Sequence, residues 1–243
     1  ARRREENLQA VPIAVSAISG DELVRRGVRN AYDLQNTVPS LTMSTNGTMS
    51  KAIMPAIRSV ATRSFLLLDD SPVGTYFAEA VVGHPWGFAE TFYDIHSVQT
   101  LRGPQGTLFG RNTTGGAILV EPNKPDFGGF DANARLTFGN YNLKQVDGML
   151  NVPFNEVVAL RLAGQHKERE GYTTNILSGQ KRDGVGNYAG RVQLTIRPSE
   201  TFSTNTIVDL LDMDATPSGA KVAALYGPNG GFGLFGPTTP RTN

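Results

Sequence analysis

The stretch "LRGPQGTLFGRNTTGGA", Leu101–Ala117, holds five glycines and leads directly into an apolar run, "AILV", that is typical of a β-strand. Glycine reaches backbone conformations closed to other residues and lets two chain segments approach closely. A phosphate-binding loop would explain such a stretch, but neither the Gly-Lys-Ser/Thr ending nor the G-x-G-x-x-G spacing occurs in it. We therefore interpret the glycines as a means of sharp turning and tight packing against another surface.

The chain up to about residue 125 combines short strands and short helices. "VPIAVSAI", residues 11–18, predicts a strand, and Ser19 with Glu22 three residues later predicts a capped helix that Gly27 ends. Asn30 caps a second helix in the same way. Further short strands are expected in "AIR", "FLLLD", "SVQTLRG" and "GAILVEP", and long loops in "LTMSTNGTMSK" and "YFAEAVVGHPWGFAE". The pattern predicts a small α+β domain over residues 1–125.

From about residue 128 the apolar residues recur at every second position. In "ANARLTFGN", for example, Leu136 and Phe138 share one face and Arg135 and Thr137 the other. Four more runs follow the same rule: "KQVDGMLNV", "VVALRLAGQHK", "GRVQLTIRP" and, less cleanly, "FSTNTIVDLLD". Each run has roughly the nine to eleven residues with which a tilted strand crosses a bilayer.

The connections between these runs favour a membrane barrel over a soluble sheet. "PFNE" and "PSET" are short, whereas "EREGYTTNILSGQKRDGVGN" is long, and this asymmetry is typical of outer-membrane barrels. The first hairpin, "GNYN", is also short and is a mild exception. A soluble antiparallel sheet with one solvated face would show the same alternation and stays as the alternative. Five strands cannot close a barrel, so residues 126–243 are expected to be the incomplete N-terminal part of one.

Composition excludes some classes of function. The 243 residues carry a net charge of only +1, which argues against nucleic acid as a partner, and there is no cysteine. No apolar run reaches the length of a membrane helix. The chain starts without methionine on "ARRREENLQA" and ends in a Gly/Pro-rich stretch, so we expect it to be an excerpt of a longer protein.

Several segments resemble the TonB-dependent outer-membrane receptors. "VQTLRGPQGTLFGRNTTGGAILVEPNKP" is similar to the end of their plug domain, and "VPIAVSAISGDELVRRGVRNAYDLQNTVPSLTM" to its start. "AIRSVATRSFLLLDDSPVG" resembles the middle, although Ser59 stands where the family usually has glycine. "GNYNLKQVDGMLNVPFNEVVALRLAGQHKEREGY" resembles the first barrel hairpins. The resemblance covers nearly the whole chain.

The resemblance implies a fold and a function. The fold would be an α+β plug inside an antiparallel transmembrane β-barrel of about 22 strands. The function would be active import of a scarce, large ligand, first of all a ferric siderophore, with cobalamin or a glycan as alternatives. TonB would drive import by pairing with a short segment upstream of residue 1, and outer-membrane lipid would surround the barrel. The implied location is the outer membrane of a Gram-negative cell.

The resemblance also assigns residues. It implies that Arg58 and Arg102 form a charged latch with glutamates of barrel strands outside this chain, the alternative being ordinary surface pairs. The plug motif comprises Gly103, Pro104, Gly106, Gly110, Arg111, Gly115 and Gly116.

Ligand contacts at the plug apex are expected from the aromatic loop that holds Tyr76, Phe77, His84 and Trp86. The alternative is that these side chains pack against the barrel wall or one another. His84 and His96 lack further ligands at useful spacing, so no metal site or other cofactor is expected. No nucleophile-elbow motif occurs, and we expect no enzyme.

Two rival functions remain open. A signal-transducing receptor of the same family would carry a further N-terminal domain. A secreted β-rich binding protein that attaches to glycans would be soluble and stable without a membrane.

Overall fold

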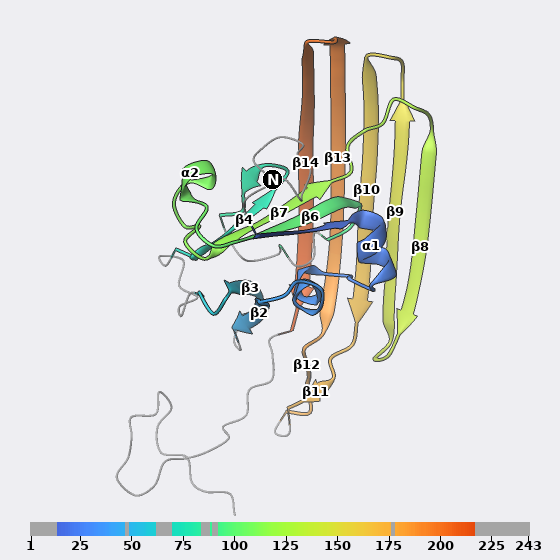
Figure 1. Cartoon of the computed structure of the whole chain (residues 1–243). Coiled ribbons are helices and arrows are strands. Elements are labelled where there is room, and N and C mark those ends of the chain that lie inside the picture. The colour runs from blue at the N-terminus through green and yellow to red at the C-terminus, as the bar shows by residue number, and fades with distance from the viewer. Residues whose placement is uncertain are drawn as a thin grey trace, which may run out of the picture.

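The computed structural model describes residues 14–46, 49–61, 70–83, 88, 92–175 and 178–216. It contains two five-stranded sheets, one from each half of the chain, and two small hairpins (Figure 1). The second sheet stands as a tall wall of long strands, and the first half of the chain lies against one of its faces. None of the helices in these ranges is long and apolar enough to cross a membrane.

The first half builds a mixed sheet in the strand order β1-β6-β7-β4-β5. β4 and β7 are parallel, whereas β1 and β7 each pair antiparallel with β6. The elements are β1 (Ala14–Ser19), α1 (Gly20–Arg25), the 3₁₀ helix η2 (Ala31–Asn36), β2 (Leu41–Asn46), β3 (Met49–Ile57), β4 (Val73–Phe77), β5 (Ala80–Val81), β6 (Ile95–Arg102), α2 (Gly106–Phe109) and β7 (Gly116–Pro122).

The predicted helix starts are confirmed, with one difference in detail. The Ser19 side chain accepts a hydrogen bond from the Glu22 backbone N–H at the start of α1, and Gly27 has the left-handed φ of 69° expected after a helix. Glu22 turns its carboxylate to Arg25 and Arg26. Asn30 and Asp33 form the full reciprocal capping box at η2.

The stretch "LTMSTNGTMSK", predicted as a long loop, contributes instead to the antiparallel pair β2 and β3. The dipeptide Asn46-Gly47 is a local hairpin signal that the prediction of a loop did not use. The strand predicted in "FLLLD", residues 65–69, lies outside the described residues. The core of the first half lies between its sheet and the helices, around Leu34, Ile57 and Ile118, each fully buried.

The wall is antiparallel throughout, in the order β14-β13-β10-β9-β8. Its strands are β8 (Asp131–Gly139), β9 (Leu143–Pro153), β10 (Val158–Arg169), β13 (Val185–Ser199) and β14 (Phe202–Ala215). The short hairpin of β11 (Thr173–Thr174) and β12 (Lys181–Arg182) lies in the long connection between β10 and β13. All five strands that the alternation predicted are present.

The two faces of the wall reverse the pattern of a soluble sheet. Polar side chains face the first half of the chain and are buried: Gln145, Asn151, Arg161, Gln165, Asn187, Arg191, Gln193 and Thr195. Large apolar side chains occupy the exposed face: Leu136, Phe138, Val146, Tyr188, Val192, Val208 and Leu210. A soluble antiparallel sheet exposes its polar face to water, so this wall is built for an apolar surrounding.

Aromatic side chains lie at both ends of the exposed face. Phe130, Phe154 and Phe202 stand at the end with the short turns, exposed by 71%, 62% and 58%. Phe138 and Tyr188 lie towards the other end, exposed by 74% and 63%. Aromatic girdles that flank an apolar band are the mark of strands crossing a bilayer.

Candidate functional site

The two halves of the chain contact each other through a cluster of polar residues, here called the corner, that includes Asp94, Arg161 and Arg191. Arg161 on β10 donates two hydrogen bonds to Asp94, the residue just before β6. Its Nε donates to Oδ2 and its Nη2 to Oδ1, each at 2.7 Å. The two side chains are only 9% and 7% exposed. A planar guanidinium that meets a carboxylate with two bonds fixes direction as well as distance. The pair therefore holds the first half in one orientation on the wall.

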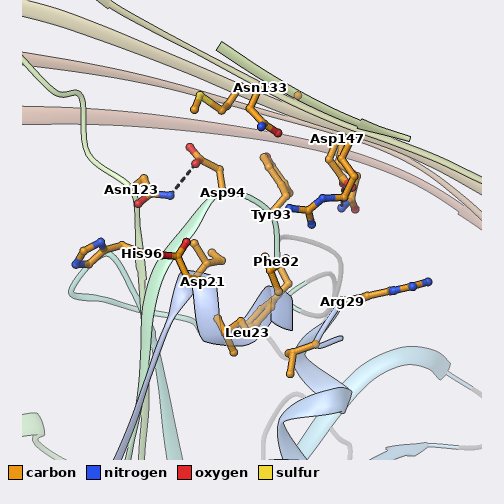
Figure 2. Close-up of a pocket in the computed structure, with 18 of the residues that line it drawn as sticks. Asp21, Leu23, Arg29, Phe92, Tyr93, Asp94, His96, Asn123, Asn133 and Asp147 are labelled. Atoms are coloured by element: carbon orange, nitrogen blue, oxygen red, sulfur yellow. Dashed lines mark hydrogen bonds between the residues drawn. The ribbon is translucent and has the colours of Figure 1, made fainter. Parts of the chain in front are cut away.

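The backbone at Asp94 is unusual. Its φ of 50° lies in the left-handed region, which a residue other than glycine enters at a cost. The Asn123 side chain donates a further hydrogen bond of 2.8 Å to Asp94 Oδ1, so that the carboxylate is held from the wall and from the end of β7 (Figure 2). Arg161 and Asn123 together stabilise the left-handed backbone conformation of Asp94.

Arg191 on β13 makes the second contact of the corner. Its side chain is fully buried and donates from Nε to Asp209 Oδ1 at 2.7 Å and from Nη1 to the Tyr93 carbonyl at 3.2 Å. Its guanidinium carbon lies 4.5 Å from the centre of the Phe77 ring and 4.7 Å from that of Tyr93. One cation thus joins two wall strands to two aromatic residues of the first half.

Tyr93 packs directly against the wall. Its side chain is 5% exposed and packs with Ala163 and Ala189, two small residues of the polar face. Its hydroxyl is buried and has no hydrogen-bond partner among the described residues. Burial raises the pKa of this hydroxyl to about 12, partly opposed by the charge of Arg191.

Amide side chains extend the contact towards the linker. Gln193 donates to the Asn123 carbonyl at 2.6 Å. Asn151, 1% exposed, accepts from the Asp126 N–H at 2.9 Å and donates to the carbonyls of Asp126 and Gly129. The linker from β7 to β8 is therefore fixed to β9 through fully paired groups.

Beside this corner the two halves are separated by a cavity of about 630 Å³ (Figure 2). Polar and apolar side chains both line it, with α1 on one side and β8, β9 and β10 on the other. Asp147 on β9 is held there by the amides of Gln145 and Gln165, at 2.7 to 3.0 Å. The described residues contain no group of three or more His, Asp or Glu side chains that would hold a metal ion.

The glycine-rich stretch lies at the opposite end of β6 and β7, away from the wall (Figure 1). Gly103 and Gly110 have left-handed φ values of 94° and 79°. A side chain on Gly116 would stand 2.3 Å from the Leu101 carbonyl oxygen, and one on Gly115 would press on Val60. These are turns and close approaches within the first half of the chain, and packing of the stretch against another surface stays a prediction. Gly106 has open space around it, and Pro104 and Arg111 are exposed.

The structure does not bring the two predicted latch arginines to the wall. Arg102 ends β6, paired with Ala14 and Gly116, and its buried Nε has no partner among the described residues. Arg58 is exposed in a tight turn with a φ of 52°. Their latch with strands outside this chain stays a prediction.

The predicted ligand residues split into two groups. Tyr76 is 6% exposed and donates from its hydroxyl to the Phe109 carbonyl at 2.6 Å, and Phe77 lies against Arg191. Both belong to β4 and not to the predicted loop, and both make the packing contacts that the sequence analysis gave as the alternative. His84 and Trp86 lie outside the described residues, so ligand binding by this loop stays a prediction.

Comparison with known proteins agrees with this geometry. Residues 7–117 match the family model of the TonB-dependent receptor plug domain. Over these residues the chain is a plug domain of the TonB-dependent receptor family. Its first half is the plug of that family, and the strands of the wall match the antiparallel strands of receptor structures.

Individual relatives are distant. The chain is 26% identical over 125 residues to the pesticin receptor of Yersinia enterocolitica, a match that covers 51% of this chain and 18% of that receptor. It is 23% identical over 173 residues to an iron-regulated outer membrane virulence protein of Vibrio cholerae, a match that covers 67% of this chain and 26% of that protein. The ferric yersiniabactin uptake receptor of Yersinia pestis has the same fold, with a TM-score of 0.69 and 21% identity. The match covers 77% of this chain and 29% of that receptor. The chain thus spans less than a third of the length of the receptors it matches.

Sequence reasoning did not predict the contacts among the corner residues Asp94, Arg161 and Arg191. Alternation places both arginines on the polar face of the wall, but their partners lie 67 and 98 residues away along the chain. A left-handed aspartate has no sequence pattern of its own. The signal in the sequence was the alternation itself, which places Arg161 and Arg191 with other polar residues on one face of the wall.

Proposed function

We propose that this chain forms the plug and the first five strands of an outer-membrane receptor that imports a scarce, large ligand, most simply a ferric siderophore. The observation that carries the proposal is the reversed wall: buried polar side chains face the plug, and exposed apolar ones face outwards between aromatic girdles. A plug held through polar groups is released at a lower cost than one sharing an apolar core with the wall, since water replaces the lost contacts.

The relatives support iron as the cargo. The Yersinia pestis protein is a ferric yersiniabactin uptake receptor, and the Vibrio cholerae protein is iron-regulated and lies in the outer membrane. Cobalamin or a glycan remains the alternative ligand. The proteins that the chain matches are receptors and not enzymes, and catalysis is not part of the proposal.

The proposal includes the parts that lie beyond the described residues. TonB would act on a segment upstream of the plug, and Arg58 and Arg102 would meet acidic residues of strands outside this chain. The boundary between plug and barrel would fall at residues 125 and 126, between the end of β7 and the start of β8.

The test uses the full-length gene product in a Gram-negative host that lacks its own siderophore receptors. We expect the protein in the outer-membrane fraction, with a gel mobility that changes on boiling. Growth on a ferric siderophore as sole iron source should require both the receptor and TonB. Recovery in the periplasmic or culture fluid would favour a secreted binding protein, and growth without TonB would contradict active import.

A further inference from the structure

A second cluster of interest lies at the long-loop end of the wall. Arg169 ends β10 and stands on the same face as Arg161 and Gln165, because side chains two positions apart share a face. Its Nη2 donates to the Asp183 carbonyl at 2.7 Å, and its guanidinium carbon lies 5.1 Å from the centre of the Tyr172 ring. The long connection after β10 thus places an aromatic ring beside a cation of the plug-facing side.

Tyr172 is paired with a second tyrosine. The rings of Tyr141 and Tyr172 lie 5.8 Å apart at 54°, although they come from different connections. The Glu170 N–H donates to the Tyr141 carbonyl at 2.9 Å, and the Asn142 side chain donates to the Glu170 carboxylate. Backbone and side-chain bonds therefore fix the two connections to one another, which gives the ring pair a defined place.

Within the part of the chain that the structure describes, more than half of each tyrosine is exposed. Tyr141 is 57% exposed and Tyr172 52%, so the pair contributes little to a core. Lipid contact explains exposed aromatics on the other face of the wall, where Tyr188 stacks on His166. It does not explain Tyr172, because the ring lies against an arginine of the plug-facing side.

We propose that Arg169, Tyr141 and Tyr172 form a ligand contact at the mouth of the receptor that favours anionic ligands with flat aromatic rings. The proposal rests on the import function proposed above and specifies its ligand. A guanidinium attracts an anion through its charge and also stacks on flat groups, and tyrosine faces pack against the rings of a ligand. A neutral ligand without rings gains from neither contact.

The experiment measures equilibrium binding to the full-length receptor in detergent, with two radioiron probes. One is a trianionic iron(III) tris-catecholate and the other a neutral iron(III) tris-hydroxamate. We expect the wild type to prefer the catecholate, and added salt to weaken only that complex. Arg169→Gln should lower catecholate affinity about tenfold, remove most of its salt dependence and leave hydroxamate binding unchanged.

Matched variants separate binding from folding. Tyr172→Ala should weaken the catecholate complex, Tyr172→Phe should keep it, and Tyr188→Ala on the lipid side should change neither complex. Every variant is compared by its gel shift on heating, which reports an intact barrel.

Three results would overturn the proposal. Preference of the wild type for the hydroxamate would reject the ligand class while leaving siderophore import intact. Equal losses for both probes in Arg169→Gln would show a structural role only. Binding of neither iron complex would reject this ligand contact together with the iron cargo.

Discussion

Arg161 and Asp94 join wall and plug through two 2.7 Å hydrogen bonds in a site almost closed to water. A buried ion pair adds little net stability, because desolvation offsets the attraction, but removal of one partner leaves an uncompensated charge. The pair therefore acts as a fixed point of orientation.

The first prediction concerns this pair. Arg161→Met leaves the Asp94 carboxylate buried without its main partner and should destabilise plug docking by about 3 to 5 kcal/mol. The double variant Asp94→Asn with Arg161→Met should recover much of that loss, since asparagine tolerates the left-handed backbone and carries no charge. The urea dependence of ion leakage through single channels of the full receptor measures docking. Losses that simply add in the double variant would show that the two residues act independently.

The second prediction concerns the shape of the Arg191 side chain. Arg191→Lys keeps the charge but loses the planar contact with Phe77 and Tyr93, because an ammonium group cannot stack on both rings. We expect it to loosen the plug nearly as much as Arg191→Gln in the same leakage assay. A lysine variant that behaves like wild type would mean that charge alone matters at this position.

The sequence predicted what depends on local chemistry. Capping of α1 by Ser19 and the alternation of the wall strands rest on neighbours a few residues apart, and the structure confirms both. The corner of Asp94, Arg161 and Arg191 was missed because each partner is supplied by a distant element. The strands β2 and β3 were missed for a different reason, because the local hairpin signal at Asn46-Gly47 was not used.

The third prediction tests the packing role of the glycine-rich stretch. Gly116 has a φ of 148°, and an added methyl group would lie 2.3 Å from the Leu101 carbonyl oxygen, so Gly116→Ala should destabilise the plug by about 2 kcal/mol or more. Gly106 begins α2 with no atom within 4 Å of the same position, and Gly106→Ala is the matched control. It should be neutral or slightly stabilising. Amide hydrogen exchange of β6 and β7 measures both, and equal effects would argue against close approach as the reason for Gly116.

The fourth prediction concerns Ser59, which stands where the family pattern has glycine. Ser59 has a φ of 65° in the tight turn between Ile57 and Val60, whose backbones are hydrogen-bonded to each other. Glycine adopts this conformation without steric cost, so Ser59→Gly should stabilise the turn by up to about 1 kcal/mol. Ser71→Gly, outside any left-handed turn, should bring no such gain. We expect Ser59→Gly to slow amide hydrogen exchange at Ile57 and Val60. Faster exchange in this variant would contradict a stabilised turn.

The fifth prediction concerns pH. Burial raises the pKa of Glu121 on β7 above its ordinary value of 4.5, with Glu79 adding to the shift and Lys124 and His96 opposing it. The unfolded chain therefore loses this proton at a lower pH than the folded plug does. The free energy of unfolding should fall as pH rises above 4.5 and level off once the folded carboxyl has ionised. Glu121→Gln should remove that decline.

Glu22 provides the control of opposite sign. Hydrogen bonds from Arg26 and Arg25 lower the pKa of its carboxyl below 4.5. Its contribution is therefore present above pH 4.5 and disappears as the pH falls through the folded value, so Glu22→Gln should matter at neutral pH and not in acid. Amide exchange of the plug strands at a series of pH values measures both variants. A decline that persists in Glu121→Gln would assign the pH dependence to another group.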